Sequence, residues 1–308
     1  MKFALLTFTH TLETDRGTAA GPRALLEAGL AGLLRLQGHE VDGPFEAALA
    51  PEEQMAYGAW HRIGLANAHL ARLVTASMEI KTFPLILESN CYAAPGVLAG
   101  LQRSRRTPRL GMVWIDAHAD CNTPETTLSG MLSGMPVAMS LGFCLERLRK
   151  KAGLDPPMAA RDVVMVCVRA NDPLEQDLVE ASGIETVPVA DVKGERRLLR
   201  AAMERLSQTT DLIYVHLDID ALDESEFGSM WLTASDGPTS LELAAALNLL
   251  MAYPKIAALG VSDLNPEKDA NGRMVRASLA VIEGGIAGLD HEDFGSNRSK
   301  IMNRDQWS

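Results

Sequence analysis

Residues 113–120 read Val113-Trp114-Ile115-Asp116-Ala117-His118-Ala119-Asp120, and they carry the strongest structural signal in the chain. They continue the nearly unbroken apolar run Leu110–Asp116, which is typical of a parallel strand buried on both faces. Residues 116, 118 and 120 have the period-two spacing that places side chains on one side of an extended chain. The stretch therefore predicts a buried strand that carries two carboxylates and an imidazole to its carboxyl end.

Similar apolar runs recur along the chain and predict further strands, at Lys2–Thr9, Phe83–Glu88, Val163–Arg169, Leu212–Asp218 and Ile256–Asp263. Helical patterns with start and stop signals lie between them, from Pro22 to Gly38, from Pro51 through Met78, from Thr239 to before Pro254, and from about Val275 to Gly288. This alternation predicts an α/β fold in three layers (αβα), with a mainly parallel sheet between helices. Because no repeat or long linker interrupts it, we expect a single domain over residues 1–308, with a polar, irregular tail from Asp290.

The composition excludes several classes of protein. Apolar residues make up 47% and charged residues 22% of the 308 residues, which is ordinary for a globular protein. The net charge of −11 argues against binding to nucleic acid or to an anionic membrane, because both require a basic face. The amino-terminal apolar run is too short for a signal peptide, and no stretch reaches the 18 or so apolar residues that a membrane span needs. We therefore expect a cytoplasmic protein whose four scattered cysteines (Cys91, Cys121, Cys144 and Cys167) are free thiols.

A second acidic cluster stands at the end of another predicted strand. His216-Leu217-Asp218-Ile219-Asp220 repeats the period-two spacing of the first cluster. Ligands of parallel sheets bind beyond the carboxyl ends of the strands, and carboxylates with an imidazole suit a divalent cation such as Mn²⁺. One such cluster alone is more often a helix cap or a solvated turn. Two clusters, each at the end of a predicted strand, favour a metal site, with the candidate ligands Asp116, His118, Asp120, Asp218 and Asp220.

At this point a resemblance is plain. Trp114–Pro124, followed by Thr126–Gly130 and Gly134–Pro136, resembles the motif of the arginase/agmatinase (ureohydrolase) family, especially its arginase version. The segments His216–Asp223, Leu259–Pro266 and Arg16–Arg23 also resemble parts of that family, so the similarity covers most of the chain. It implies an arginase/deacetylase-like fold and a site for two Mn²⁺ ions.

The resemblance also implies how the ligands are shared. Asp116 and Asp218 would bridge the two metals, Asp120 would complete one of them, and His118 with Asp220 would complete the other. Two ions arranged in this way can activate a shared water for attack on a planar carbon, such as that of a guanidinium group.

Cys91 stands where the family has its remaining metal ligand, a histidine. A thiolate can bind a divalent metal but prefers zinc, iron or copper to manganese. We take Cys91 as a candidate sixth ligand. The alternative is that Cys91 is only a small buried residue and that the site has lost one ligand.

Three further positions depart from the arginase pattern. Met131 replaces an asparagine. Ser133 replaces a histidine that assists proton transfer in the family, and a serine cannot act as an acid at neutral pH. His216 could substitute for that histidine, but we expect it rather to orient a carboxylate. Asp263 replaces the glutamate that pairs with the guanidinium. Its shorter side chain leaves room for an additional substituent such as an N-hydroxyl, unless the change is neutral drift.

The resemblance places substrate contacts at four residues. Asn122 and Ser129 match the pair that binds an α-carboxylate, and Asp172 and Glu175 match the acidic groups that bind an α-ammonium. Isolated residues of these types in loops are usually only turn formers. The loop Phe227–Gly237, which contains Trp231, departs most from the family; we expect either a wall at the pocket mouth or an ordinary exposed or core tryptophan.

Together these features predict a manganese-dependent amidinohydrolase that acts on a small-molecule guanidino substrate. The favoured reaction converts Nω-hydroxy-L-arginine to L-ornithine and hydroxyurea, with Asp120, Asp263 and His216 as catalytic candidates and Asp120 as the group that accepts the nucleophile's proton. The alternatives are an arginase, another guanidino or formimino hydrolase, or a weakened homologue that merely binds metal or an amino acid. Family members are often oligomers, so a homo-oligomer is also expected, although the sequence shows no interface signature.

Overall fold

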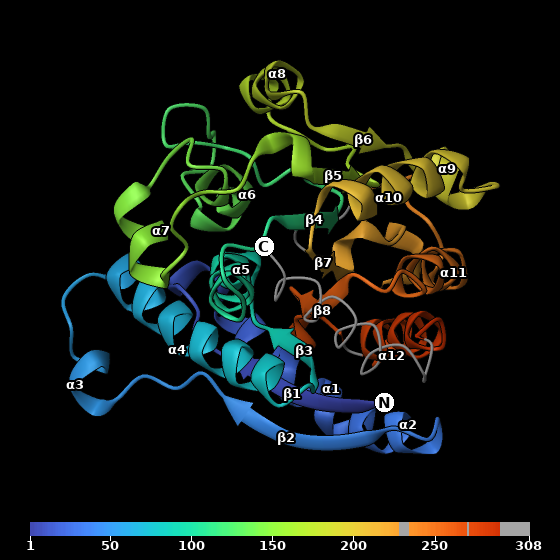
Figure 1. Cartoon of the computed structure of the whole chain (residues 1–308), viewed down its shortest axis with the longest axis horizontal. Coiled ribbons are helices and arrows are strands. Elements are labelled where there is room, and N and C mark those ends of the chain that lie inside the picture. Colours follow the sequence, from blue (N-terminus) through green and yellow to red (C-terminus); the bar gives the residue numbers. More distant parts are fainter. Residues whose placement is uncertain (228–233, 270, 290–308) are drawn as a thin grey trace, which may run out of the picture.

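Eight parallel strands form one sheet in the part of the chain that the structure describes (Figure 1). The structure is a computed structural model that describes residues 1–227, 234–269 and 271–289, except for the side chains of residues 13–16. The strand order is β2-β1-β3-β8-β7-β4-β5-β6. The strands are β1 (Lys2–Phe8), β2 (Glu40–Glu46), β3 (Phe83–Glu88), β4 (Leu110–Ile115), β5 (Val163–Val166), β6 (Glu185–Val187), β7 (Leu212–Asp218) and β8 (Ile256–Ser262).

The six strands expected from apolar runs are confirmed, and each ends within three residues of its expected boundary. The largest difference is in β5, which was expected to reach Arg169. It ends at Val166 because Cys167 takes a left-handed backbone conformation with φ of 70°, which no strand accommodates.

The two strands that the sequence analysis missed, β2 and β6, form the two edges of the sheet. β2 is mostly exposed, and β6 has only three residues. An edge strand is not buried on both faces, so it does not carry the continuous apolar run by which an interior strand is recognised.

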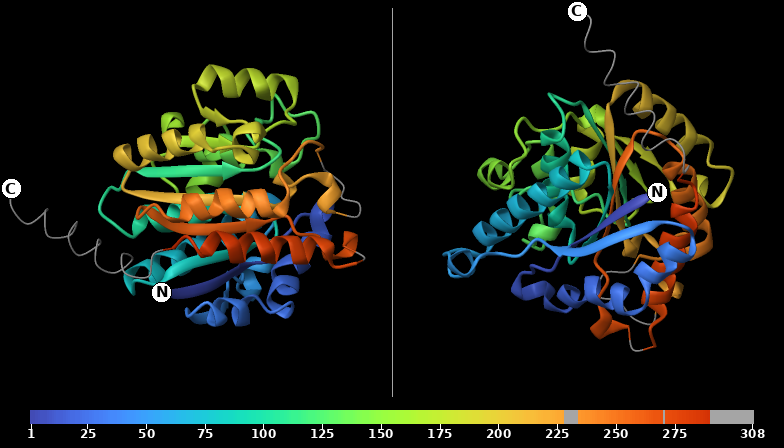
Figure 2. Two further views of the ribbon diagram at one scale, coloured as in Figure 1. Left: turned by 90° about the vertical axis from the view of Figure 1, so that its right-hand side faces the viewer. Right: turned by 60° about the horizontal axis from the view of Figure 1, so that its bottom comes forward.

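Helices cover both faces of the sheet, which confirms the three-layer α/β architecture (Figures 1 and 2). One face carries α4 (Ala59–Glu79), α5 (Ala94–Arg103), α6 (Pro136–Ser140) and α7 (Glu146–Ala152). The other carries α1 (Gly21–Glu27), α2 (Leu30–Leu36), α9 (Val189–Lys193), α10 (Arg197–Thr209), α11 (Ser240–Met251) and α12 (Arg273–Ile286).

Each buried strand contributes alternate side chains to the two hydrophobic cores between these layers. Phe3 and Leu5 belong to the core beneath α10, α11 and α12, whereas Ala4 and Leu6 belong to the core beneath α4 and α5. This alternation follows from the period-two geometry of a strand. It explains why the interior strands are apolar throughout.

Two of the expected helices are interrupted. The helix expected from Pro22 to Gly38 is divided into α1 and α2, and the one expected from Pro51 through Met78 is divided into α3 (Pro51–Gln54) and α4. Gly29 and Gly58, which stand at the breaks, have φ of 99° and 92°, a left-handed conformation that ends a right-handed helix. The expected start of α11 is confirmed, because Thr239 caps it together with Glu242.

The remaining helical elements are short. They are α8 (Pro173–Ser182) and the 3₁₀ turns η1 (Glu13–Ala20), η2 (Cys91–Ala93), η3 (Leu132–Gly134), η4 (Ala160–Asp162), η5 (Ile219–Ala221), η6 (Glu224–Glu226) and η7 (Pro266–Lys268). Among the described residues, no helix combines the length and apolar character needed to cross a membrane. The expected tail from Asp290 and most of the Trp231 loop lie outside the described residues.

Candidate metal centre and active site

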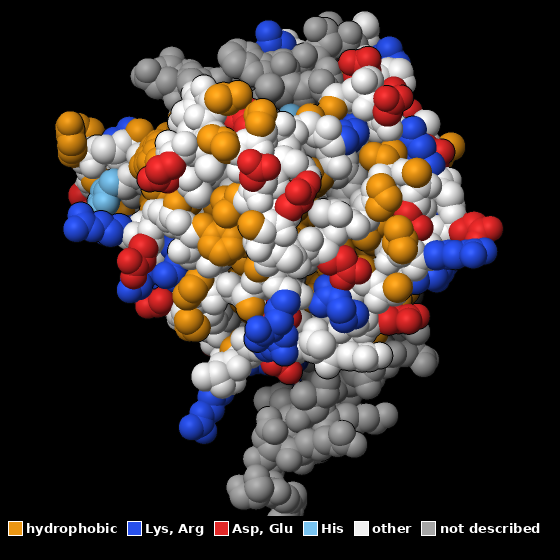
Figure 3. All heavy atoms as spheres, turned by 90° about the horizontal axis from the view of Figure 1, so that it is seen from above, with side chains coloured by type: hydrophobic (Ala, Val, Ile, Leu, Met, Phe, Trp, Pro, Cys, Tyr) orange, Lys and Arg blue, Asp and Glu red, His pale blue; other side chains and the backbone are white. Residues whose placement is uncertain are grey.

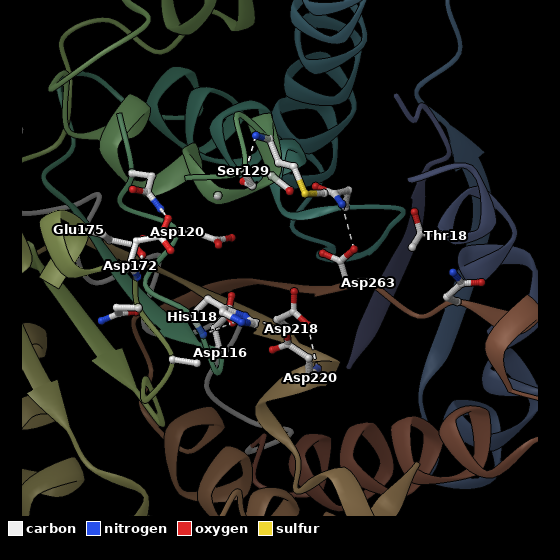
Figure 4. A pocket seen from close by; sticks show the side chains of 18 of the residues that line it. Thr18, Asp116, His118, Asp120, Ser129, Asp172, Glu175, Asp218, Asp220 and Asp263 are labelled. Atoms are coloured by element: carbon white, nitrogen blue, oxygen red, sulfur yellow. Dashed lines mark hydrogen bonds and ion pairs between the residues drawn. The ribbon is translucent and has the colours of Figure 1, made fainter. Parts of the chain in front are cut away.

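A cavity of about 690 Å³ opens beyond the carboxyl ends of the central strands. All five residues expected to be hard metal ligands line it, and they come from two adjacent strands, β4 and β7: Asp116, His118, Asp120, Asp218 and Asp220. Figure 4 shows Asp116, His118, Asp218 and Asp220 together, with Asp172 and Glu175 on one side and Asp263 on the other. The sequence therefore identified the location and the central acidic residues of this cavity.

The local backbone that presents these side chains differs from the extended chain expected from their spacing. β4 ends at Ile115, and the backbone then bends so that Asp116 Oδ1 accepts a 2.6 Å hydrogen bond from the His118 amide. After β7, Asp218 Oδ1 accepts a 2.8 Å hydrogen bond from the Asp220 amide in the same way. Aspartate readily forms such turns with the amide two residues later, so each first aspartate orients the next ligand candidate in its segment.

His118 connects the two segments. Its Nδ1 lies 3.0 Å from Asp220 Oδ2 and 3.5 Å from Asp116 Oδ1. These three side chains each offer a ligand atom, and the three atoms lie within 4.8 Å of one another. The Ala117 amide and the Trp114 indole N–H hold the carboxylates of Asp220 and Asp116 from behind, at 3.2 Å and 3.1 Å. The three ligand atoms are therefore close enough together to share one cation.

The electrostatics of the cavity also fit divalent cations. Burial and neighbouring carboxylates raise the pKa values of Asp116, Asp120 and Asp218 well above the ordinary value for aspartate. Burial opposes the charge on His118, but its hydrogen bonds to Asp116 and Asp220 raise the pKa of His118 to about 12. Several buried carboxylates at such short separations need compensating positive charge, and one imidazolium supplies only part of it. Hard oxygen ligands and an imidazole are suited to such cations.

Cys91 lies directly beside this cluster. Its side chain is 1% exposed, and its Sγ lies 2.8 Å from Asp218 Oδ2 and 3.1 Å from Asp263 Oδ2. It also shares a second group with Asp116 and Asp120, in which the three ligand atoms lie within 4.8 Å of one another. Burial, reinforced by the charge of Asp218, raises the pKa of the thiol well above its ordinary value. The position thus suits the expected role of a ligand and is also compatible with a buried small residue.

A buried polar group behind Cys91 was missed by the sequence analysis. The Tyr214 hydroxyl donates to Glu88 Oε1 at 2.9 Å and lies 2.8 Å from His216 Nδ1, while His216 Nε2 lies 3.2 Å from Cys91 Sγ. Glu88 and Tyr214 stand at fully buried positions of β3 and β7. Polar residues at fully buried strand positions were the available signal, but both were taken simply as parts of strands.

His216 is buried behind the cavity lining. The ring stacks on Trp114 with centroids 3.8 Å apart, is fully buried, and is not among the described residues that line the cavity. Burial lowers the pKa of His216 to about 3, so the imidazole is neutral. It was expected to orient a carboxylate. Its Nδ1 lies 3.5 Å from Glu88 Oε2, and its Nε2 faces the Cys91 thiol and the Ser262 hydroxyl, each at 3.2 Å.

Asp263 faces the cavity from the end of β8, and Asn90 was not expected to accompany it. The Asn90 side-chain amide donates a 2.9 Å hydrogen bond to Asp263 Oδ1, and both residues line the cavity. Asp263 has φ of 61°, an uncommon conformation for a residue other than glycine. The shortened carboxylate is therefore held in one orientation by its neighbour.

The four expected substrate-binding residues, Asn122, Ser129, Asp172 and Glu175, line the same cavity. Ser129 is exposed at its rim, and the Asn122 amide donates to Asp172 Oδ2 at 3.2 Å. Asp172 and Glu175 also form the capping box of α8, in which Glu175 accepts from the amides of Asp172 and Cys121. Both acidic residues thus have a structural role in addition to any contact with a substrate.

Met131 and Ser133, which depart from the arginase pattern, also line the cavity. A part of the lining that the sequence analysis did not identify comes from η1 and η7, with Gly17, Thr18, Asn265, Glu267 and Lys268. The Gly17 Cα lies so close to the Asn265 side-chain amide that a Cβ would collide with it, which explains the need for glycine at this contact.

Comparison with known proteins agrees with the site. The sequence model of the Arginase family matches residues 3–285. The chain is 29% identical to the arginase of Bacillus caldovelox over 278 residues, which cover 88% of this chain and 92% of that protein. It is 28% identical to the arginase of Bacillus subtilis over 276 residues, or 88% of this chain and 92% of that protein.

Solved structures show the same architecture. The structure of arginase from Bacillus caldovelox superposes with a TM-score of 0.84 at 27% identity, over 94% of this chain and 99% of that one. The structure of arginase from Bacillus cereus gives a TM-score of 0.83 at 25% identity, over 95% of this chain and 100% of that one. On its sequence, its fold and its clustered carboxylates, this chain belongs to the arginase family.

Proposed function

We propose that this protein uses two Mn²⁺ ions to hydrolyse the guanidino group of an arginine-like amino acid, with Nω-hydroxy-L-arginine as its preferred substrate. Membership of the arginase family makes the chain a hydrolase of C–N bonds, other than peptide bonds, in linear amidines. The observation that carries the proposal is the convergence of Asp116, His118, Asp120, Asp218 and Asp220 in one cavity. The products would be L-ornithine and hydroxyurea.

The proposed ligands extend two of the three groups of neighbouring donor atoms, with Asp218 added to each as a shared ligand. Cys91, Asp116, Asp120 and Asp218 would hold one ion, while Asp116, His118, Asp218 and Asp220 would hold the other. When bound, the ions would supply positive charge that balances these carboxylates and would lower the pKa of a water molecule in the cavity.

The protein's own groups would orient the reactants and move protons. An Asp120 carboxylate oxygen would accept a hydrogen bond from the attacking water and take its proton. Asp263, oriented by Asn90, would pair with the guanidinium nitrogens. Asn122 and Ser129 would bind the α-carboxylate at the rim, and Asp172 and Glu175 the α-ammonium.

Two features support the N-hydroxylated substrate. Ser133 cannot supply an acidic proton at neutral pH, so arginine would lack help at its leaving group. The shorter Asp263 side chain leaves space in the cavity for one additional oxygen on the guanidinium. Arginine itself is the second candidate, because the relatives in the comparison are named arginases.

A panel of substrates with the manganese-loaded protein tests both candidates: hydroxyarginine, arginine, agmatine, guanidinobutyrate and formiminoglutamate. We expect kcat/KM for hydroxyarginine to exceed that for arginine by about tenfold or more. Equal or faster turnover of arginine would make the protein an arginase. No product from any substrate, with less than about half an equivalent of bound metal, would favour a homologue that no longer performs the two-metal reaction. The cytoplasmic location and the homo-oligomer remain predictions.

A further inference from the structure

A line of buried polar side chains crosses the sheet behind the candidate metal centre. Glu88 on β3 and Tyr214 on β7 lie on either side of β8, yet the Tyr214 hydroxyl reaches the Glu88 carboxylate at 2.9 Å. They meet over Gly260, where a Cβ would collide with both groups. A glycine in the middle of a buried strand weakens that strand, so its presence here indicates that the close approach matters.

This line determines how the His216 imidazole is oriented. The Tyr214 hydroxyl has a single proton, which it donates to Glu88, so its oxygen accepts the Nδ1 proton of His216 at 2.8 Å. Glu88 Oε2 also lies 3.5 Å from Nδ1. The other nitrogen, Nε2, then carries the lone pair, and the Ser262 hydroxyl lies 3.2 Å from it. Histidine ligands of metals in proteins are held in this way, with one nitrogen bonded to a fixed acceptor and the other directed at the metal.

The Nε2 atom lies beside one other candidate metal ligand, the Cys91 thiol. It lies 3.2 Å from Cys91 Sγ, which in turn lies 2.8 Å from Asp218 Oδ2. The ligand atoms of Cys91, His216 and Asp218 all lie within 4.8 Å of one another. Ligands that share one zinc ion are roughly 3 to 3.7 Å apart, because the bonds to zinc are about 2.0 to 2.3 Å long.

We propose that His216 is a direct ligand of the metal position served by Cys91 and Asp218, and that this position selects a thiophilic, zinc-class ion over manganese. A thiolate, an imidazole and a carboxylate are ligands typical of zinc, whereas the group of Asp116, His118 and Asp220 suits manganese. The two positions would therefore differ in the metal they prefer. This inference rests on the proposed two-metal site, and it changes both the ligands and the preferred metal of one of its positions: manganese stays at the His118 position, and a zinc-class ion replaces it at the Cys91 position.

X-ray absorption at the zinc edge tests the ligand set directly. Metal-free protein is given one equivalent of Zn²⁺, and the first shell is expected to contain one sulfur at about 2.3 Å together with one imidazole. Sulfur without imidazole would overturn the proposal and leave His216 as a hydrogen-bond partner of the thiol. Imidazole without sulfur would also overturn it, because the zinc would then occupy the His118 side.

Substitution supplies the second measurement. His216→Asn should keep the sulfur in the zinc shell, lose the imidazole, and lower the ratio of zinc to manganese affinity by about tenfold or more. The change in this ratio is the informative quantity, because zinc outcompetes manganese at most protein sites. His69→Asn, the same change on α4 where His69 pairs with Glu53, should leave the shell and the ratio unchanged. An unchanged ratio in His216→Asn would contradict the proposal.

The two proposals can fail separately. A sulfur–imidazole shell in a protein that hydrolyses no guanidino substrate would contradict the proposed function and support the ligand assignment. A shell with sulfur but no imidazole, in a protein that does hydrolyse hydroxyarginine, would support the proposed function and contradict the assignment of His216 as a ligand. If His216→Asn does not fold, the wild-type spectrum alone decides whether His216 is a ligand.

Discussion

Cys91 is the only sulfur-containing side chain among the proposed metal ligands; all the others offer oxygen or imidazole nitrogen atoms. Its sulfur lies among Asp218, Asp263, Ser262 and His216, with all four contacts between 2.8 and 3.2 Å. In that position a thiol is either a ligand or a neutral filler, and the two roles have different consequences for metal binding.

We expect Cys91→Ala to reduce bound manganese from about two equivalents to about one, because one position loses a ligand. The loss of activity should be about a hundredfold or more, since both ions are needed to activate water. Cys91→His should restore metal content. Metal analysis by mass spectrometry and a coupled ornithine assay measure these effects, with Cys144→Ala as the control. Full metal content and activity in Cys91→Ala would show that Cys91 is not a ligand.

Asp263 is the residue by which substrate choice can be examined. Its Oδ1 is held by the Asn90 amide at 2.9 Å, so the carboxylate has little freedom to adapt to a smaller guanidinium. Asp263→Glu extends the carboxylate into the space proposed for the N-hydroxyl. We expect kcat/KM for hydroxyarginine relative to arginine to fall by about tenfold, as for other single-group discriminations in a fitted site.

The control for this prediction is Asp269→Glu. Asp269 accepts hydrogen bonds from the amides of Met274 and Val275 at the start of α12 and is not among the described residues that line the cavity. The Asp269→Glu variant should leave the ratio of kcat/KM for hydroxyarginine to kcat/KM for arginine unchanged. If Asp263→Glu also leaves it unchanged, the shortened side chain does not discriminate between the two substrates.

Two thiols outside the site provide a pH-dependent prediction. Burial raises the pKa of both Cys144 and Cys167 to about 12. At pH 8 about one molecule in ten thousand would carry the reactive thiolate, compared with roughly a quarter for an ordinary cysteine. Labelling by iodoacetamide, followed at each site by mass spectrometry, should be more than about a hundredfold slower in the native protein than in denaturant, and should accelerate as the pH rises toward 12. Rapid native labelling of either cysteine at pH 8 would contradict this.

In β8, Gly260 leaves the room in which the Glu88 carboxylate and the Tyr214 hydroxyl meet. Gly260→Ala places a methyl group against the Glu88 carboxylate and the Tyr214 hydroxyl, neither of which can move far in the fully buried interior. We expect a loss of about 2 to 3 kcal/mol in the free energy of unfolding, measured by urea denaturation.

Gly111→Ala on β4 is the matched control for β8. There the new methyl group meets the side-chain ends of Leu206 and Thr210 at 3.0 to 3.1 Å, which can shift slightly. Its cost should be smaller, about 1 kcal/mol. Equal costs in the two variants would mean that the polar line over Gly260 tolerates displacement.

A strand could be predicted from the sequence only where it is buried on both faces. Interior strands such as β4 were recognised because both of their faces are apolar, and the acids at their ends followed from that assignment. The edge strands β2 and β6 were missed, and α1 and α2 were taken as one helix because a glycine inside a helical pattern does not reveal its φ angle. Glu88 was missed for a different reason. Its partners Tyr214 and His216 are more than 120 residues away, so only the fold shows that they meet.

The arrangement of the sheet explains why one edge of the molecule carries the chemistry. The central strands β3, β8, β7 and β4 all point the same way, so segments that lie far apart in the sequence meet at a single edge. The helical layers on both faces hold these strands from either side. On the face shown in Figure 3, acidic and basic side chains are interspersed over the surface. The cavity, in contrast, holds a concentrated group of carboxylates, which contributes to the negative net charge of the chain.

That internal group should make the stability of the whole molecule depend on metal. Asp116, Asp218 and Asp220 are almost fully buried and lie close together, so a bound cation relieves their mutual repulsion in the folded state, whereas the unfolded chain has no such group to fill. At a manganese concentration a hundred times the dissociation constant, we expect about 2.7 kcal/mol of added stability, or roughly 5 °C in Tm. Differential scanning calorimetry of chelator-treated protein, titrated with Mn²⁺, measures the shift. Asp218→Asn, which removes a charge shared by both proposed positions, should melt at a temperature nearly independent of Mn²⁺, and a wild-type Tm that ignores Mn²⁺ would contradict a native two-metal site.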